Sequence, residues 1–396
     1  MGEKGGSRAS KSNKLTVRLG YVFDTSSQRG AELDQPLFAV LQAVQHGGSI
    51  VHAAKALDRS YRYVWGVLHE WEKSFDAPLV VWSQGQRARL TEFGQRLLWA
   101  ELRARKRLQP HIEALRTEIE RLVAQARDDR LLLLTLCASH DLALPRLREH
   151  AAQRGPLHID LHFQGSIDSV RSLNAGRCLV AGFHVPALQG SAPTFAKALK
   201  PLLRPGVHKL IGCSRRTQGL MMRREYAGAV RDVADLAGSP LRFVNRQLGS
   251  GTRLLMDHLL QRSGLRARDI TGYDSAVEES HVAVAACIAS GVADVGPGVE
   301  AAALEFGLHF EPLVEEDYFL VCLKHNLEHP AVQLLRLLLA DDGWTRLLAA
   351  LPGYRPARAP GDVLMMTAAL PWWRFARPKR RSSSVQPRRR RASEAA

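Results

Sequence analysis

A series of helix-capping residues between residues 34 and 60 predicts several closely spaced helices. Asp34 with Pro36 predicts the N-cap and first turn of one helix. Ser49 and Ser60 predict the N-caps of two more, the first of them short, at 50–57. The alanines at 53 and 54 are small enough for two of these helices to cross closely.

A predicted β-hairpin and a long helix follow. Strands at 79–82 and 87–90 flank a glycine-containing turn at 84–86, and Thr91 is the expected N-cap of a helix that reaches about residue 126. Only Pro110 interrupts that helix. A further strand is expected at 15–23. Two short helices, a tight turn, a longer helix and a hairpin together predict an α+β winged helix-turn-helix.

The start of the third helix carries the residues that we expect to contact DNA. The N-terminal end of a recognition helix meets base edges and phosphates in the major groove, and basic residues on a wing suit phosphate or minor-groove contact. The candidate DNA-binding residues are Arg59, Ser60, Tyr61, Arg62 and Tyr63 on the helix, with Arg87 and Arg89 on the returning strand. Trp65 and Trp71 are expected in the core.

The segment at 48–102 reads GSIVHAAKALDRSYRYVWGVLHEWEKSFDAPLVVWSQGQRARLTEFGQRLLWAEL. From about residue 15 to 105 the chain resembles the N-terminal domain of ModE-type molybdate-responsive regulators, relatives of the LysR-type family. The resemblance implies that the helix at 91–128 is a linker and dimerisation element. A homodimer or homotetramer would then place two recognition helices on two half-sites of a double-stranded DNA operator.

From residue 130 the pattern changes to strand, polar loop and helix in alternation. Apolar runs at 131–137, 157–163, 179–183 and 241–245 each precede a polar loop, which predicts α/β structure with parallel sheets. Ligands on such sheets bind beyond the carboxyl ends of the strands. Several of these loops place Gly, Ser or Thr at a helix start, where free backbone N–H groups attract anions.

The candidate ligand-binding residues are therefore Ser139, His140, Gly165, Ser166, Ser250, Gly251, Thr252, Ser280 and His281. The competing interpretation is simple helix capping, which Ser and Thr perform in every kind of protein. Convergence of several loops would favour a binding site, and convergence is a property of the tertiary structure.

Two further segments read NRQLGSGTRLLMDHLL at 245–260 and ASGVADVGPG at 289–298. They are similar to the type II periplasmic-binding-protein-like domain of molybdate-binding proteins and, divergently, of LysR-type effector domains, with a coverage of about 131–370. The resemblance implies two α/β lobes around a ligand cleft, with two crossing strands near 208–212 and 317–323. ModE itself carries a different, small β-rich module, so molybdate specificity does not follow from the N-terminal resemblance.

The two resemblances together imply a transcriptional regulator whose effector is a small oxyanion. Molybdate, tungstate, sulfate and formate are the candidates, and the expected target is a molybdenum-enzyme operon such as that of formate dehydrogenase. Asp141, Glu278 and Glu279 stand near the predicted loops and would repel a dianion, which favours a monoanion. The alternative is an anion- or molybdenum-cofactor-handling protein whose winged helix contacts other proteins.

Composition excludes several other classes. The net charge of +16 lies mostly in the two ends of the chain, where basic tails favour polyanions in a salt-dependent way. The chain has no P-loop, GxSxG or HExxH motif, so no catalytic or metal-binding residues are assigned and no enzyme or cofactor is expected. Five widely spaced cysteines are expected to be reduced and buried. The absence of a signal peptide and of a long apolar run predicts a cytoplasmic protein without membrane contact.

The predicted organisation has five parts. A disordered leader at 1–14 precedes the winged helix-turn-helix at 15–90 and the linker helix at 91–128. A two-lobed domain follows at 130–370, and a basic disordered tail at 371–396.

Overall fold

The structure, a computed structural model, describes residues 35–82, 87–127, 131–188 and 193–373. The leader, the expected strand at 15–23, the hairpin turn at 84–86 and the tail from residue 374 lie outside these ranges. Residues 371–373, which we expected in the disordered tail, form a short 3₁₀ helix in which Trp372 is buried. The reason is apolar packing, since Trp372 joins the core of the second domain.

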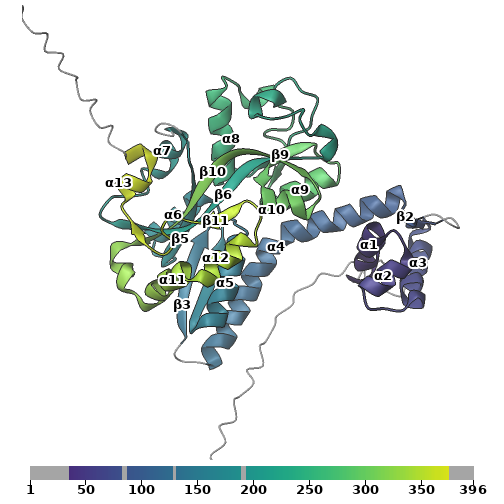
Figure 1. The fold of residues 1–396 in the computed structure, drawn as a ribbon, viewed down its shortest axis with the longest axis horizontal. Helices are drawn as coiled ribbons and strands as arrows, with labels where there is room; N and C mark the ends of the chain where they lie inside the picture. Colours follow the sequence, from purple (N-terminus) through teal and green to yellow (C-terminus); the bar gives the residue numbers. More distant parts are fainter. Residues whose placement is uncertain (1–34, 83–86, 128–130, 189–192, 374–396) are drawn as a thin grey trace, which may run out of the picture.

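The N-terminal domain has the predicted order of elements (Figure 1). They are α1 (Gln35–Gly47), α2 (Ile50–Ala56), α3 (Tyr61–Phe75), β1 (Val80–Val81), β2 (Arg89–Leu90) and α4 (Glu92–Arg127). Three predicted caps are present: Ser49 Oγ accepts from the His52 amide at 3.0 Å, Ser60 Oγ from Tyr63 at 3.1 Å and Thr91 Oγ1 from Gly94 at 2.9 Å. The chain turns tightly between α2 and α3, where Asp58 has a φ of 52°.

Helices α1, α2 and α3 share one core. Ala53 of α2 is fully buried, and so are Val64 and Leu68 on one face of α3. Trp71 lies on the same face of α3 and is buried, as predicted. The prediction for Trp65 was wrong: it is 40% exposed and stacks on His69 at 4.9 Å, because residues 65 and 69 lie on the side of the helix that faces away from α1 and α2.

The second domain is built on two long antiparallel strands, β6 (His208–Met222) and β10 (His309–Leu323), which run through both lobes. They contain the two crossing strands expected near 208–212 and 317–323. In the first lobe β10 pairs with β5, and the parallel strands β5, β3 and β4 complete the sheet in the order β10-β5-β3-β4. In the second lobe β9 pairs with the end of β6, and β7 and β8 form a short parallel pair.

The remaining elements cover these strands (Figure 1). The first lobe contains β3 (Leu132–Ala138), α5 (Ala143–Arg154), β4 (Leu157–Phe163), α6 (Ser166–Asn174), β5 (Val180–Pro186), α7 (Pro193–Leu199), α11 (Pro330–Ala340), α12 (Asp342–Ala349), β11 (Tyr354–Pro356), β12 (Val363–Leu364) and α13 (Met366–Ala369). The second lobe contains β7 (Asn245–Arg246), α8 (Gly251–Arg262), β8 (Val277–Glu278), α9 (His281–Ala289), β9 (Val295–Val299) and α10 (Glu300–Glu305).

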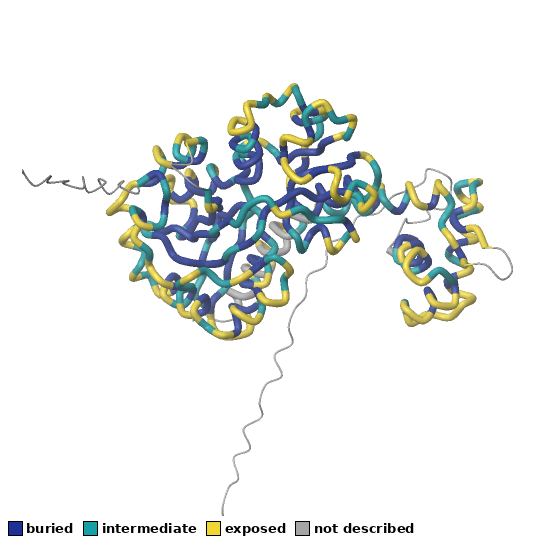
Figure 2. Tube along the Cα trace, turned by 45° about the horizontal axis from the view of Figure 1, so that its top comes forward, coloured by how far each residue is buried: buried dark blue, intermediate teal, exposed yellow. Residues whose placement is uncertain are grey.

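Two apolar cores lie on opposite faces of the sheet. Along β10, Leu320 and Cys322 face one core, while Phe319 and Val321 face the other, as the two-residue period of a strand requires. Figure 2 shows the buried positions gathered along the strands, with exposed positions around the rim. The five cysteines are buried and unpaired, as expected.

Two strand predictions need correction. The apolar run at 241–245 is a strand only at Asn245–Arg246, because Phe243 forms a single bridge to Val295 instead of a continuous ladder. His184 was expected in a loop after its strand, but it lies inside β5, since β10 pairs with that strand as far as Pro186.

Helix α4 connects the two domains. It leaves the hairpin, and its later turns contact α9 and the edge strand β4 (Figure 1). Pro110 lies near its middle, where a missing N–H breaks the helical hydrogen-bond ladder. Among the described residues, no helix is both long and apolar enough to span a membrane.

Candidate anion pocket and nucleic-acid interface

The predicted DNA-binding residues are exposed, some at the start of α3 and the others on the returning strand of the hairpin. Residues 59–63 are all exposed, and the guanidinium of Arg59 lies over the Tyr63 ring at 5.4 Å. Within the described ranges, Arg59, Arg62 and Arg89 form no ion pair with an acid, so their charges are available for phosphate. Trp65, which the sequence placed in the core, extends this face one turn further along α3.

The hairpin is fixed beside the same helices. The Ala88 amide donates to the Gly48 carbonyl at 2.8 Å, and the Arg87 side chain packs against Gly48, where an added Cβ would lie 3.4 Å from Arg87 Cδ. Gly48 has a φ of 62°, which favours glycine. This contact places Arg87 and Arg89 next to the turn that precedes α2.

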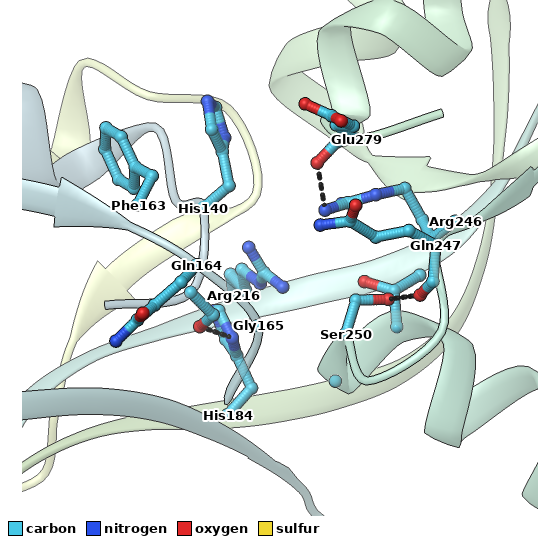
Figure 3. Close-up of a pocket in the computed structure, with 13 residues that line it drawn as sticks. His140, Phe163, Gln164, Gly165, His184, Arg216, Arg246, Gln247, Ser250 and Glu279 are labelled. Carbon is cyan, nitrogen blue, oxygen red and sulfur yellow. Dashed lines mark hydrogen bonds between the residues drawn. The ribbon is translucent and has the colours of Figure 1, made fainter. Parts of the chain in front are cut away.

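A cavity of about 40 Å³ lies between the two lobes of the second domain (Figure 3). The carboxyl ends of β3, β4, β7 and β8 open onto it, as expected for a sheet of this kind. Its lining residues are Ser139, His140, Phe163, Gln164, Gly165, His184 and Arg216 from the first lobe and the long strand β6, with Arg246, Gln247, Ser250, Gly251, Thr252 and Glu279 from the second lobe.

The loops that the sequence marked as candidates therefore converge. Six of the candidate residues line the cavity: Ser139, His140, Gly165, Ser250, Gly251 and Thr252. Ser166 lies directly beside it: its hydroxyl is buried without a hydrogen-bond partner, 3.2 Å from where a Cβ on Gly251 would sit. Ser280 and His281 do not line the cavity. Ser280 caps α9 by accepting from the Ala283 amide at 3.1 Å, and His281 is fully buried with neither ring nitrogen hydrogen-bonded.

The sequence interpretation missed two buried arginines, Arg216 and Arg246. Arg216 lies in the middle of a long strand, far in sequence from every candidate loop, and only the topology brings it to the cavity. Arg246 stands three residues before Gly249, within the quoted segment at 245–260, so its position near a glycine-rich helix start was a usable signal.

Arg216 belongs to a fully buried ion network. Its Nη1 donates to Asp141 Oδ2 at 2.9 Å and its Nε to Glu316 Oε2 at 3.0 Å. Asp141 also contacts His184 Nε2 at 3.2 Å and accepts from the Tyr354 hydroxyl at 3.2 Å. Burial opposes ionisation of Asp141, but the hydrogen bond from His184 and the charge of Arg216 outweigh it and lower the pKa of Asp141 to about 2. The carboxylates thus offset the charge of Arg216 at neutral pH.

Arg246 lacks directly bonded carboxylates of this kind, and the nearby charges of Glu316, Glu279 and Glu278 only partly favour its ionised form. Its Nε donates to the Glu278 carbonyl at 3.2 Å and its Nη2 to the Glu279 carbonyl at 2.6 Å, and no carboxylate within the described part of the chain bonds to it. Burial and the neighbouring charge of Arg216 lower the pKa of Arg246 to about 9. It remains charged at pH 7, so the cavity contains a desolvated positive charge that an anion would stabilise.

Two histidines that line the cavity, His140 and His184, are neutral, and so is His281, which does not line it. Burial and the charge of Arg246 lower the pKa of His140 to about 3, and the same two causes lower the pKa of His281 well below its ordinary value. Burial and Arg216 also lower the pKa of His184. At pH 7 these imidazoles are therefore uncharged, and each can donate one hydrogen bond.

The two lobes approach each other closely at two glycines. A Cβ on Gly165 would lie 2.9 Å from the Gly249 carbonyl oxygen of the other lobe. Gly165 is the N-cap of α6 and Ser250 is the N-cap of α8, so two helix N-termini of opposite lobes meet at the cavity. Aligned peptide dipoles make both termini favourable for negative charge.

Two of the three acids expected to repel a dianion do not reach the cavity. Asp141 is held by Arg216, as described above, and the side chain of Glu278 points to Arg107 on α4, with 2.9 Å between Arg107 Nε and Glu278 Oε2. Only Glu279 lines the cavity, and its side chain is 52% exposed. The preference for a monoanion therefore loses most of its support.

Protein-family models match parts of both domains. A family described as bacterial regulatory helix-turn-helix proteins of the LysR family matches residues 36–95, and the PBP superfamily domain matches residues 147–340. The protein YvgK of Bacillus subtilis (strain 168), named as uncharacterized, is 28% identical over 235 residues, which are 59% of this chain and 74% of YvgK.

Several solved structures are similar to part of the chain at low sequence identity. CbnR in complex with its target DNA is 16% identical, with a TM-score of 0.37 over 80% of this chain and 99% of that one. An OxyR mutant of Corynebacterium glutamicum is 14% identical, with a TM-score of 0.41 over 79% and 93%. A phosphate transporter substrate-binding protein with bound phosphate, from Clostridium perfringens, is 12% identical, with a TM-score of 0.43 over 57% and 100%.

Proposed function

We propose that the chain is a DNA-binding transcriptional regulator of the LysR type and that its effector is a small oxyanion bound between the two lobes of the second domain. The observation that carries the proposal is the buried guanidinium of Arg246, which lines the cavity between the lobes and bonds to no carboxylate among the described residues. Desolvated charges in proteins are normally paired, and an anion is the missing partner here.

The size of the cavity restricts the ligand. A volume of about 40 Å³ is room for roughly three water molecules, since one water needs about 10–15 Å³ by this measure. Formate, molybdate and tungstate are of this order, whereas drug-sized ligands occupy pockets of roughly 300 Å³ or more. The lobes would have to open for anything larger.

The lining supports an oxyanion over an apolar ligand. The Arg246 guanidinium, the unpartnered hydroxyl of Ser166 and the N-termini of α6 and α8 supply donors from both lobes. Neutral His140 adds a further N–H. Formate, molybdate and tungstate share this chemistry, and the target that we propose from the sequence resemblance is a molybdenum-enzyme operon such as that of formate dehydrogenase.

An exposed apolar stripe on α4 supports a homodimer as the working unit. An apolar residue recurs along the helix at alternating steps of four and three residues: Leu108, Ile112, Leu115, Ile119 and Leu122. Such spacing is typical of a coiled-coil seam. Four of the five are 39–55% exposed, so their apolar surface awaits a partner, and a second copy of the same helix is the partner of matching pattern.

The regulation that we propose is a change in the balance between two arrangements of the dimer. An anion that binds both lobes stabilises their closed state, and it shifts the DNA-binding heads only by its difference in affinity for the two states. The dimer, or a tetramer made from two dimers, would occupy a double-stranded operator with two half-sites.

A thermal-shift panel with formate, molybdate, tungstate, sulfate and acetate at constant ionic strength tests the effector. An anion at 100 times its dissociation constant stabilises the protein by about 2.7 kcal/mol. A shift with one anion identifies the effector, and no shift with any of them contradicts the oxyanion proposal. Footprinting with that anion then tests regulation. A protein that binds the anion but no DNA would be the anion-handling protein considered from the sequence.

A further inference from the structure

The linker helix α4 and the pocket meet at one residue, Glu278. Its side chain is 3% exposed and faces α4, where it pairs with Arg107: the Arg107 Nε lies 2.9 Å from Oε2 and 3.1 Å from Oε1. Its backbone carbonyl faces the other way and accepts from Arg246 Nε at 3.2 Å. The two arginines, one on α4 and one in the pocket, are therefore bonded to the same residue.

The next residue, Glu279, also contacts both the pocket and α4. The Glu279 carbonyl accepts from Arg246 Nη2 at 2.6 Å, while the Glu279 side chain lines the pocket and lies 3.9 Å from His111 on α4. Glu278 also ends β8, which pairs in parallel with β7 at Arg246. The segment at 278–279 is thus held by the pocket on one side and by α4 on the other.

We propose that Arg107 and Glu278 form the link through which occupancy of the pocket is transmitted to α4, with Arg107 as a positioning residue. This inference rests on the proposed anion pocket. An anion that draws Arg246 towards the cavity competes with the two carbonyls for the same N–H groups and shifts the 278–279 segment. The buried carboxylate of Glu278 moves with that segment, and Arg107 must follow, because separating them would leave a buried charge unpaired.

The adjacent contacts on α4 provide a matched control. Lys106 Nζ pairs with Glu305 Oε1 of α10 at 2.8 Å, and Trp99 packs near Phe306 with ring centroids 6.4 Å apart. These contacts join α4 to the same lobe but have no hydrogen bond to the pocket. Lys106→Gln therefore removes one ion pair from the same interface without touching the proposed link.

The linkage has a reciprocal consequence. If pocket and helix are coupled, a change in α4 alters anion affinity by the same factor by which the anion alters the equilibrium of α4. Arg107→Gln should then change anion affinity by about five-fold or more, although Arg107 does not line the pocket. Lys106→Gln should leave the affinity unchanged.

Hydrogen exchange of the full-length protein, followed by mass spectrometry, tests the proposal with and without the anion from the panel that binds. In the wild type and in Lys106→Gln, the anion should change exchange in α4 around residues 99–112 by about five-fold or more. In Arg107→Gln the anion should still bind, with exchange protection in the pocket loops, but the response of α4 should be lost. A response of α4 that persists in Arg107→Gln, or one that is absent from the wild type, overturns the proposal and leaves the effector site intact.

A comparison without ligand separates this proposal from the proposed function. Arg246→Gln removes the guanidinium bonds to the 278–279 carbonyls, so exchange in α4 should change in the free protein as well. If no anion of the panel binds, the effector proposal fails, and this variant decides the coupling alone. Unchanged exchange in α4 of Arg246→Gln would refute the link.

Discussion

Substitution of Arg246 with Gln should weaken anion binding without unfolding the protein. Arg246 is 3% exposed, and its bonded partners among the described residues are backbone carbonyls. Its pKa is lowered to about 9, chiefly because of burial and then because of the charge of Arg216. A lowering of this size corresponds to about 5 kcal/mol against the charged form.

Two effects of the substitution nearly cancel in the free energy of unfolding. The variant removes this unfavourable charge, and it also loses two hydrogen bonds from a charged donor, which are worth about 1.5–3 kcal/mol each. We therefore expect the stability at pH 7 to change by less than about 2 kcal/mol. In anion binding, no comparable gain offsets the lost hydrogen bond. One lost charge-assisted hydrogen bond weakens binding by about 1.5–3 kcal/mol, which is about 10- to 150-fold.

The assays are denaturant unfolding for stability and titration calorimetry for the anion identified by the panel. Arg358→Gln is the control, since Arg358 is an exposed arginine of the same domain that does not line the cavity. Undiminished anion affinity in Arg246→Gln would refute the assignment of the pocket. A loss of stability above about 3 kcal/mol would refute the reasoning that the charge of Arg246 is only partly compensated.

Further predictions concern the dimer, the DNA, the histidines and the cleft. Leu115→Asp should convert dimers to monomers in analytical ultracentrifugation, because it places a charge in the apolar stripe of α4, and an unchanged dimer would exclude that stripe. Arg62→Ala should weaken binding to any duplex DNA and reduce the slope of log K against log salt by about 1, and an unchanged slope would remove Arg62 from the interface. His140 and His281 are neutral in the folded state but titrate near 6.5 in the unfolded state, so the unfolded state binds more protons below that pH. Together they should lower the free energy of unfolding by roughly 3 kcal/mol between pH 6.5 and 5. His281→Gln should remove about half of this loss in urea unfolding, and a loss equal to that of the wild type would contradict the prediction. Gly165→Ala should weaken anion binding about ten-fold or more, because a Cβ 2.9 Å from the Gly249 oxygen holds the lobes apart, with calorimetry as the test.

Local sequence patterns were sufficient for much of the N-terminal domain. Ser49, Ser60 and Thr91 cap the helices that they were predicted to cap, because a capping hydroxyl acts on amides only two or three residues away. Trp65 shows the limit of that reasoning. An apolar ring on a helix indicates packing, but which face of α3 meets α1 and α2 depends on the arrangement of three helices.

The same distinction between local and tertiary information applies to the pocket residues. The loops that contain Ser139, Gly165 and Ser250 could be found from the sequence because each combines a strand end with a helix start, and both are local signals. Arg216 could not be found in this way. Its neighbours in sequence indicate only a strand, and its partners Asp141 and Glu316 are brought to it by the pairing of β6 with β10 and by the folding of the first lobe.

Local sequence patterns therefore predicted the two kinds of domain and most of the loops that face the cavity. Which charges in those loops are paired depends on the folded arrangement of the whole domain. The acidic groups of Asp141 and Glu278 looked repulsive to a dianion in the sequence, but both are paired with arginines, whereas Arg246 is left without a carboxylate. Charge pairing depends on distances of a few ångströms between segments far apart in the chain, and such distances are set by the packing of the whole domain.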